Sequence, residues 1–238
     1  THPSAMTTEN LSISQHFVLL GLGDIAIDFE TALAPDCFKG WNYVRCVALC
    51  SANHRVFFDF KKFNEAERLE FKENCERSGI TFIAHNWGFD GRILKDVVRA
   101  NLKNPGVCTM IKSWLISNGQ QRLEGYQSNI SLAATVEREL GVKLEKDLQA
   151  QDWMNKELKE QDIEYCMRDA QFALELNTIL SQKILEQSLS KASEIEHKVI
   201  GPTNEMESSG LHMNRDKVDS LMKDFIDTRD TSHKAFVE

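Results

Sequence analysis

Three short groups of polar residues have the types and spacings that metal-assisted chemistry needs. The first is the triplet Asp28-Phe29-Glu30, at the end of a run with period-two alternation over residues 24–30. Residues i and i+2 of a strand point to the same face, so Asp28 and Glu30 project together while Phe29 faces the core. Two adjacent carboxylates repel each other, and a divalent cation would neutralise them. A solvated strand end is the alternative interpretation of this triplet.

The other two groups each pair residues four positions apart. Asn86 and Asp90 lie where an apolar strand runs into a helix, although helix capping by Asn86 would also explain them. Tyr165 and Asp169 lie in a strongly helical stretch and therefore share one helix face. A phenol and a carboxylate presented together suit a metal site with an ordered water, and an exposed Asp beside a half-buried Tyr is the alternative. Arg168, between them, is expected to face outward or to pair with a Glu.

The elements that must position these groups alternate between strand and helix patterns in the first half of the chain. Strands are expected at residues 24–30, 43–51, 55–60, 80–84 and 107–110. Helices are expected at 64–78, at 88–102 and over most of the chain from 111 on, apart from a polar break at 117–129. Asn64 is the expected N-cap of the first of these helices, and Gly79 its stop. This order predicts the α/β class, with a mixed sheet flanked by helices.

Composition limits the classes of function. The chain has 238 residues, of which 42% are hydrophobic and 27% charged, and a net charge of −8. Binding nucleic acid through bulk positive charge is therefore excluded, although a local basic patch is not. No apolar run is long enough for a membrane span, and the start of the chain lacks the pattern of a signal peptide. Residues 1–10 are expected to be a tag remnant or a disordered N-terminus.

The six cysteines form no close pair. Zinc frameworks need such pairs, so a zinc site is not expected. Scattered thiols favour a reducing intracellular compartment, such as the cytoplasm, a phage-infected cell or an organelle matrix, and not a secreted protein. We expect six free structural thiols.

The character of the chain changes around residue 190. Residues 191–238 carry no strand pattern and predict two helices separated by residues 208–210. This segment is too short to bury a core of its own. It is either a docking appendage or the beginning of a further domain.

Taken together, the three groups resemble the three motifs of the DEDDy 3′–5′ exonucleases, D-x-E, N-x₃-D and Y-x₃-D, in the same order. Glu164 stands where the related DEDDh branch has its histidine. The resemblance covers about residues 22–188. It is strengthened by the stretches Ser131-Leu-Ala-Ala, Glu139-Leu-Gly141, Lys146-Asp-Leu-Gln149, Asp152-Trp153 and Gln161-Asp-Ile-Glu-Tyr165.

This resemblance implies an RNase H-like (DnaQ-like exonuclease) fold, in which a five-stranded mixed sheet carries the catalytic groups at one end. It also implies an enzyme that releases nucleoside 5′-monophosphates from the 3′ end of single-stranded or frayed DNA. Two Mg²⁺ or Mn²⁺ ions are expected. One is held by Asp28, Glu30 and Asp169, and the second by Asp28 with Asp90 nearby through water. Tyr165 is expected to orient the attacking water.

Four residues are expected to touch the nucleic acid. Asn86 would hold the terminal nucleotides, and Thr31 and Arg92 would lie beside them. Leu33 would wedge against the terminal base, although the family's leucine position is occupied here by Ala34.

A basic series extends the expected contact surface. Lys and Arg recur at steps of three and four and are expected to share one face of the helix over 88–102. They are Arg92, Lys95, Arg99 and Lys103. Such a stripe would contact the backbone of single-stranded DNA. A solvated helix face is the alternative.

The tail suggests where this domain belongs. Asn204-Glu-Met-Glu-Ser-Ser-Gly210, followed by a helix, resembles the entry into the polymerase module of family A DNA polymerases. We therefore expect a proofreading exonuclease domain over 11–190 and the truncated start of a polymerase domain over 191–238. The expected partners are the primer 3′ end and that polymerase domain, with no membrane, and the expected state is a monomer.

Two alternatives remain open from the sequence. An RNA-processing exonuclease of the RNase D type shares all three motifs, and a requirement for the 2′-hydroxyl would favour it. A catalytically silent RNase H-like module would bind nucleic acid without cutting it, but such a module need not keep all five motif residues.

Overall fold

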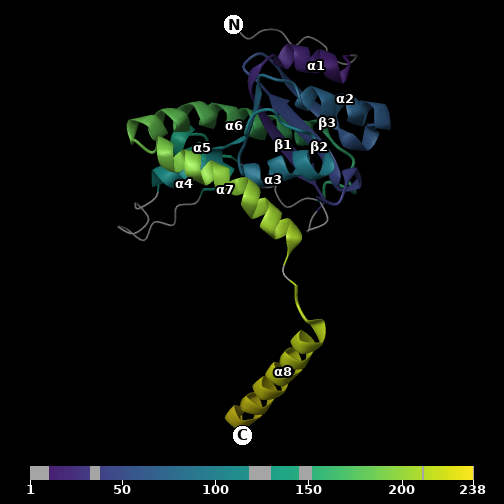
Figure 1. Cartoon of the computed structure of the whole chain (residues 1–238), viewed down its shortest axis with the longest axis vertical. Coiled ribbons are helices and arrows are strands. Elements are labelled where there is room, and N and C mark those ends of the chain that lie inside the picture. The colour runs from purple at the N-terminus through teal and green to yellow at the C-terminus, as the bar shows by residue number, and fades with distance from the viewer. Residues whose placement is uncertain (1–10, 33–37, 118–129, 145–151, 211, 238) are drawn as a thin grey trace. The chain divides into compact units, whose positions relative to one another are not determined.

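The first of two compact units is built on a five-stranded sheet. In the computed structural model, the described residues are 11–32, 38–117, 130–144, 152–210 and 212–237, and the chain divides into a unit ending at Gly201 and a unit beginning at Pro202. The strands are β1 (Gly23–Thr31), β2 (Val44–Cys50), β3 (Arg55–Asp59), β4 (Ile80–Ala84) and β5 (Val107–Cys108). They lie in the order β3-β2-β1-β4-β5. Figure 1 labels β1, β2 and β3 of this sheet. β1 runs antiparallel to β2 and parallel to β4. The prediction of a mixed five-stranded sheet is confirmed.

Helices account for most of the other described residues. They are α1 (Ile13–Leu20), α2 (Glu65–Cys75), α3 (Trp87–Arg92), α4 (Thr109–Ser117), α5 (Leu132–Leu140), α6 (Glu160–Glu186), α7 (Ser190–Ser209) and α8 (Arg215–Val237). A π-helical turn over Ile93–Val97 continues α3. Side-chain caps begin several of these helices, as in α2, where Asn64 accepts the backbone N–H of Glu67.

The two faces of the sheet are packed differently. On one face, large apolar side chains of the strands, such as Ile27 and Phe29 of β1, pack against α1, α2 and α3. On the other face, small side chains, such as Ala26 and Ala48, meet Ala170 of α6. Small residues let the axis of a helix approach the sheet closely. The long helix α6 therefore lies directly against the face on which Asp28 and Glu30 project.

Several boundaries differ from the sequence prediction. The helix predicted over 64–78 ends at Cys75, and Gly79 instead forms the turn into β4 with φ +90°. The helix predicted over 88–102 ends at Val97, and Arg99 has φ +58°. Past Val97 the apolar pattern continues because Val98, Ala100 and Leu102 still pack against the core. The helix α1 was not predicted, although its cap, Ser12, accepts the N–H of Gln15.

The second unit consists of the end of α7 and the helix α8. The two helices predicted around residue 210 are found, and Gly210 separates them with φ +65°. Apolar side chains of α8, such as Leu221, Met222 and Phe225, are exposed. No helix among the described residues has the length and hydropathy to cross a membrane.

The described cysteines are free and buried. They are Cys46, Cys50, Cys75, Cys108 and Cys166. The sixth, Cys37, lies outside the described residues. For these five, the prediction of free structural thiols is confirmed.

Candidate active site

Strand β1 presents the first carboxylate pair toward α6. Its buried residues Ile27 and Phe29 face the opposite core, and Asp28 and Glu30 are half-buried on the α6 side. In the register with β2, Asp28 lies opposite Ala48 and Glu30 opposite a cysteine. These small neighbours leave room for the carboxylates beneath the helix.

The helix α3 brings Asp90 to the same end of β1. Because β1 and β4 are parallel, α3 begins at the edge where β1 ends. Asp90 is 3% exposed, and its Oδ1 accepts the backbone N–H of Phe29 at 3.0 Å. This hydrogen bond ties Asp90 to the part of β1 that carries Asp28 and Glu30.

Asn86 lies just before α3, with its side chain exposed. It has φ +84°, in the left-handed region, and makes no side-chain capping bond to the helix. The capping interpretation of Asn86 is therefore wrong. The exposed amide is available at the opening of the site.

The helix α6 supplies Tyr165 and Asp169 from above the sheet. Both side chains are buried, and the Oδ1 atom of Asp169 has no hydrogen-bond partner. The Nε atom of Arg168, also buried and without a partner, lies 3.9 Å from that oxygen. The guanidinium carbon of Arg168 lies 5.4 Å from the centre of the Tyr165 ring. Arg168 therefore lies near Tyr165 and Asp169 rather than pairing with a Glu, and its side chain is 36% exposed.

Burial raises the pKa of all four carboxyl groups, and repulsion by the neighbouring carboxylates adds to this for Asp28 and Glu30. Desolvation, followed by the charges of Glu30, Asp90 and Asp169, holds the pKa of Asp28 well above its usual range. Burial raises the pKa of Glu30 to about 9.

The other two carboxyl groups shift less, because each has a favourable partner. Burial raises the pKa of Asp90 to about 7, against the hydrogen bond from Phe29. Burial raises the pKa of Asp169 to about 6, against hydrogen bonding with Tyr165 and the charge of Arg168. The structure thus brings the three sequence motifs into one electrostatic cluster.

The donor set of this cluster fits a hard divalent cation. All its ligating atoms are oxygens, which Mg²⁺ and Mn²⁺ prefer. The unpartnered Oδ1 atom of buried Asp169 is a further sign, since buried carboxylate oxygens are normally hydrogen-bonded or coordinated. Among the described residues, no three His, Cys, Asp or Glu side chains are already arranged tightly around one point.

Two residues of the loop before α6 also border the cluster. The ring of Trp153 lies 6.1 Å from the ring of Tyr165, and the ammonium of Lys156 lies 4.7 Å from the centre of the Trp153 ring. Lys156 binds Asp162 at 2.5 Å and lowers the pKa of Glu30 against the effect of burial. In the sequence, this border of the cluster is marked only by the Asp152-Trp153 stretch of the family resemblance.

The predicted contact residues are only partly brought together. Thr31 lies at the end of β1, with its hydroxyl bonded to the carbonyl of Ala32 at 3.1 Å. The guanidinium carbon of Arg92 lies 3.9 Å from the centre of the Phe38 ring, and its Nε is 3.2 Å from Asp96. Leu33 and Ala34 lie outside the described residues.

The basic stripe does not exist as one helix face. Only Arg92 and Lys95 belong to helical turns, whereas Arg99 and Lys103 follow the end of the π-helical turn. The reason is the left-handed backbone at Arg99, which redirects the chain.

Comparisons with known proteins agree with this geometry. A family model described as 3′–5′ exonuclease matches residues 6–185. No curated protein matches the sequence. Brucella melitensis NrnC bound to pGG is a similar solved structure, with a TM-score of 0.63, 20% identity and coverage of 81% of this chain and 88% of that one. NrnC has also been solved with bound Mg²⁺.

Two further solved structures are longer than the matched region. Escherichia coli RNase D, an exoribonuclease involved in structured RNA processing, gives a TM-score of 0.64 at 19% identity, with 81% of this chain and 48% of that chain covered. The catalytic core of RRP6 from Trypanosoma brucei gives a TM-score of 0.61 at 19% identity, with coverage of 79% of this chain and 48% of that chain. These likenesses establish the fold, and the family model spans most of the chain. The chain therefore belongs to the 3′–5′ exonuclease family.

Proposed function

We propose that this protein is a metal-dependent 3′–5′ exonuclease that shortens single-stranded RNA or short oligonucleotides and releases nucleoside 5′-monophosphates. The observation that carries the proposal is the cluster of four carboxyl groups at one end of the sheet, two buried and two half-buried, each with a raised pKa. Similar solved structures include a nuclease bound to the dinucleotide pGG and an exoribonuclease. They support RNA or oligonucleotides as the substrate class over a polymerase primer.

Four carboxylates would hold the metal ions. In our proposal Asp28, Glu30 and Asp169 would hold one Mg²⁺ ion. Asp28 would also hold a second Mg²⁺ ion, with Asp90 nearby through water. When bound, such ions neutralise the carboxylates and lower the pKa of an attacking water. Asp90 keeps its place through the backbone N–H of Phe29, independent of any ion.

Tyr165 would position the attacking water without taking its proton. Burial and the neighbouring carboxylates raise the pKa of Tyr165 above its ordinary value, so its hydroxyl stays protonated at neutral pH. A protonated phenol donates one hydrogen bond and accepts others. It therefore orients a water rather than acting as the general base.

A pair of matched substrates tests the proposal. We would incubate the purified chain with 5′-labelled single-stranded RNA and DNA of identical sequence, with Mg²⁺ or with excess EDTA. The expected result is a ladder shortened from the 3′ end, faster on RNA and absent in EDTA. Cleavage that continues undiminished in EDTA, or products cut internally, would contradict the proposed function.

A second candidate is proofreading for a family A DNA polymerase. The sequence Met206-Glu-Ser-Ser-Gly210 before α8 favours it, as a polymerase-like entry segment. A DNA primer with a mismatched 3′ end on a template separates the two candidates. Preferential removal of the mismatched nucleotide, with little activity on RNA, would favour proofreading.

A further inference from the structure

A cavity lies away from the carboxylate cluster, near the beginning of β1 and β4. It has a volume of about 590 Å³, and its lining includes Thr81, next to the start of β4. Thr81 is paired with Asp24 at the beginning of β1, whereas Asp28 lies further along that strand. On α6, the lining residue Leu185 comes sixteen positions after Asp169, a rise of roughly 24 Å along a helix. The cavity is therefore separate from the candidate active site.

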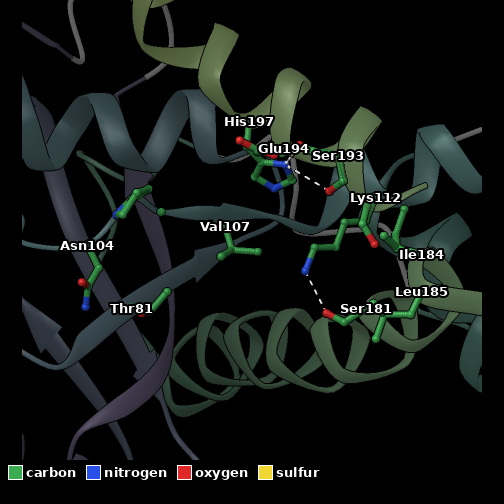
Figure 2. A pocket seen from close by; sticks show the side chains of 13 residues that line it. Thr81, Asn104, Val107, Lys112, Ser181, Ile184, Leu185, Ser193, Glu194 and His197 are labelled. Carbon is green, nitrogen blue, oxygen red and sulfur yellow. Dashed lines mark hydrogen bonds between the residues drawn. The ribbon is translucent and has the colours of Figure 1, made fainter. Parts of the chain in front are cut away.

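Most of the cavity wall is apolar. Pro105 and Val107 come from the segment leading into β5, and Ile184 and Leu185 from the last turns of α6. Figure 2 shows Val107 facing Lys112 across this space, with the side chains of α6 below. A concave, mainly apolar cavity of a few hundred Å³ with a few polar groups is the usual form of a small-molecule site.

Lys112 of α4 places a positive charge inside this apolar wall. Its Nζ donates to Asn177 Oδ1 at 2.7 Å and to Ser181 Oγ at 2.8 Å. Figure 2 shows the ammonium between Val107 and Ser181. Two of its three N–H groups are used by these contacts, and both partners are neutral.

No described carboxylate forms an ion pair with Lys112. Asp24 attracts it, but binds Asn177 rather than the ammonium. Glu194, at the cavity lining, is instead paired with Lys191 at 3.1 Å and Lys198 at 2.6 Å. A partly buried ammonium is normally paired with an anion, because burying an unpaired charge is costly.

The remaining polar lining is neutral. His197 Nε2 accepts the backbone N–H of Cys108 at 3.0 Å, and its Nδ1 lies 2.7 Å from the carbonyl of Ser193. One ring nitrogen therefore accepts while the other donates, which defines the neutral imidazole. The cavity thus offers one cation, hydroxyl groups, an apolar surface and one carboxylate, that of Glu194, which Lys191 and Lys198 already neutralise.

We propose that this cavity binds a small organic anion, with its carboxylate or phosphate on Lys112 and its apolar or aromatic body against Val107, Ile184 and Leu185. Such a ligand would bring a negative charge into direct contact with Lys112, which Asp24 reaches only through Asn177. Two sources share this chemistry, a nucleoside monophosphate and a carboxylic acid without a base. The proposal does not depend on the proposed function, because the ligand meets none of the nuclease residues.

Binding of defined probes tests the proposal. We would titrate the methyl-labelled full chain in EDTA with 5′-AMP, octanoate, adenosine, octanol and inorganic phosphate, following the methyl signals of Val107, Ile184 and Leu185 by NMR. The expected result is saturable shifts of these signals by 5′-AMP, octanoate or both, and at least tenfold weaker binding of the matching neutral probe. Whichever anion binds identifies the source.

Three variants test the assignment to Lys112. Lys112→Met removes the charge and keeps the length, and we expect at least tenfold weaker binding of the anionic probe. Leu185→Glu adds a repelling charge at a position that is 64% exposed, so it leaves the core intact and is also expected to weaken binding. Lys143→Met removes an equal charge at an 87% exposed position outside the cavity and is the control with unchanged binding.

Several results would overturn the proposal. They are no saturable shift with any probe at millimolar concentration, equal affinity for the anions and their neutral counterparts, or binding of phosphate alone as tight as that of the larger anions. Unchanged affinity in both Lys112→Met and Leu185→Glu would also overturn it. If circular dichroism shows that Lys112→Met does not fold, the affinity of Leu185→Glu alone tests the proposal.

Discussion

At the scale of single residues, the candidate active site opposes the stability of the fold. Asp28, Glu30, Asp90 and Asp169 are brought together where burial disfavours their charges. Hydrogen bonds offset this effect for Asp90 and Asp169 but not for Asp28 and Glu30. Charged groups placed in this way are costly unless a cation joins them. This loss of folding free energy arises at the same residues to which we assign metal binding and cleavage.

Asp28→Ala and Tyr165→Phe are expected to impair cleavage to different degrees. Asp28 is the carboxylate that we assign to both ions, so its loss should remove nearly all cleavage. Tyr165→Phe keeps every carboxylate and removes one positioning hydroxyl, which is typically worth on the order of 10²–10³ in rate. Single-turnover cleavage of a short oligonucleotide, measured beside its dissociation constant, checks both. If Asp28→Ala cuts faster than Tyr165→Phe, the role given to Asp28 is wrong.

The stability of the metal-free protein is expected to depend on pH. Burial raises the pKa of Asp169 to about 6, of Asp90 to about 7 and of Glu30 to about 9, above the usual range near 4. Between about pH 4 and pH 9 these carboxyl groups hold more protons in the folded state than in the unfolded state. The free energy of unfolding is therefore highest below about pH 4 and falls as the pH rises to about 9. Urea unfolding in EDTA across this range measures the fall, and saturating Mg²⁺ should reduce it.

Asp28→Asn provides the matched variant for that measurement. It removes the charge at the centre of the cluster and keeps the shape of the side chain. We expect it to make the metal-free protein more stable at pH 8, because burial and the charges of Glu30, Asp90 and Asp169 disfavour the ionised form of Asp28. A variant less stable than the parent at pH 8 would show that repulsion at Asp28 is not what opposes folding.

At the scale of elements, the position of α3 depends on one tightly enclosed ring. Trp87, the first residue of α3, lies between Gly91 and Gly106, and a Cβ at either glycine would come within 3 Å of the indole. The same short helix carries Asp90 one turn later. Close packing at Gly106 therefore helps to place a candidate catalytic carboxylate.

Gly106→Ala is expected to disturb both stability and cleavage. The new Cβ would lie 1.9 Å from the Trp87 ring, so the indole and the start of α3 must move. Overpacking of this kind typically costs about 1–3 kcal/mol. Thermal unfolding and single-turnover cleavage check this, with Gly201→Ala, which meets no heavy atom within 4 Å, as the control. Equal behaviour of the two variants would contradict the packing argument.

At the scale of the whole molecule, the first unit needs the beginning of α7. His197 accepts a backbone bond from Cys108, and Ile200 packs against the main core cluster. These contacts lie before Gly201, where the first unit ends. All described residues of the candidate active site and of the anion cavity belong to this unit.

Two shortened chains test the importance of this segment. A chain ending at Gly201 should cleave within about twofold of the full chain. A chain ending at Leu189 loses the bond from Cys108 and the packing of Ile200, and should be less stable by about 2 kcal/mol. Thermal unfolding and cleavage of both chains provide the measurement. Equal stability of the two would favour a domain boundary near residue 190, as the sequence predicts.

The sequence by itself determined the strands, the α/β class and the three motifs. Period-two alternation at residues 24–30 is a local property, so it predicts that Asp28 and Glu30 share a face without knowledge of the partner strands. The four-residue spacing of Tyr165 and Asp169 has the same local origin. The order of the elements predicts a mixed sheet, and the family resemblance adds the number of five strands, which the structure confirms.

Only the tertiary structure decided what depends on contacts between distant segments. It put Arg168 against Asp169, ended the basic stripe before Arg99 and brought α7 against β5 to enclose the cavity around Lys112. None of these is visible in local periodicity, because each depends on which residues far apart in the chain are packed together. The carboxylates show both contributions. Their types and spacing came from the sequence, whereas their raised pKa values come from the burial and proximity that folding imposes.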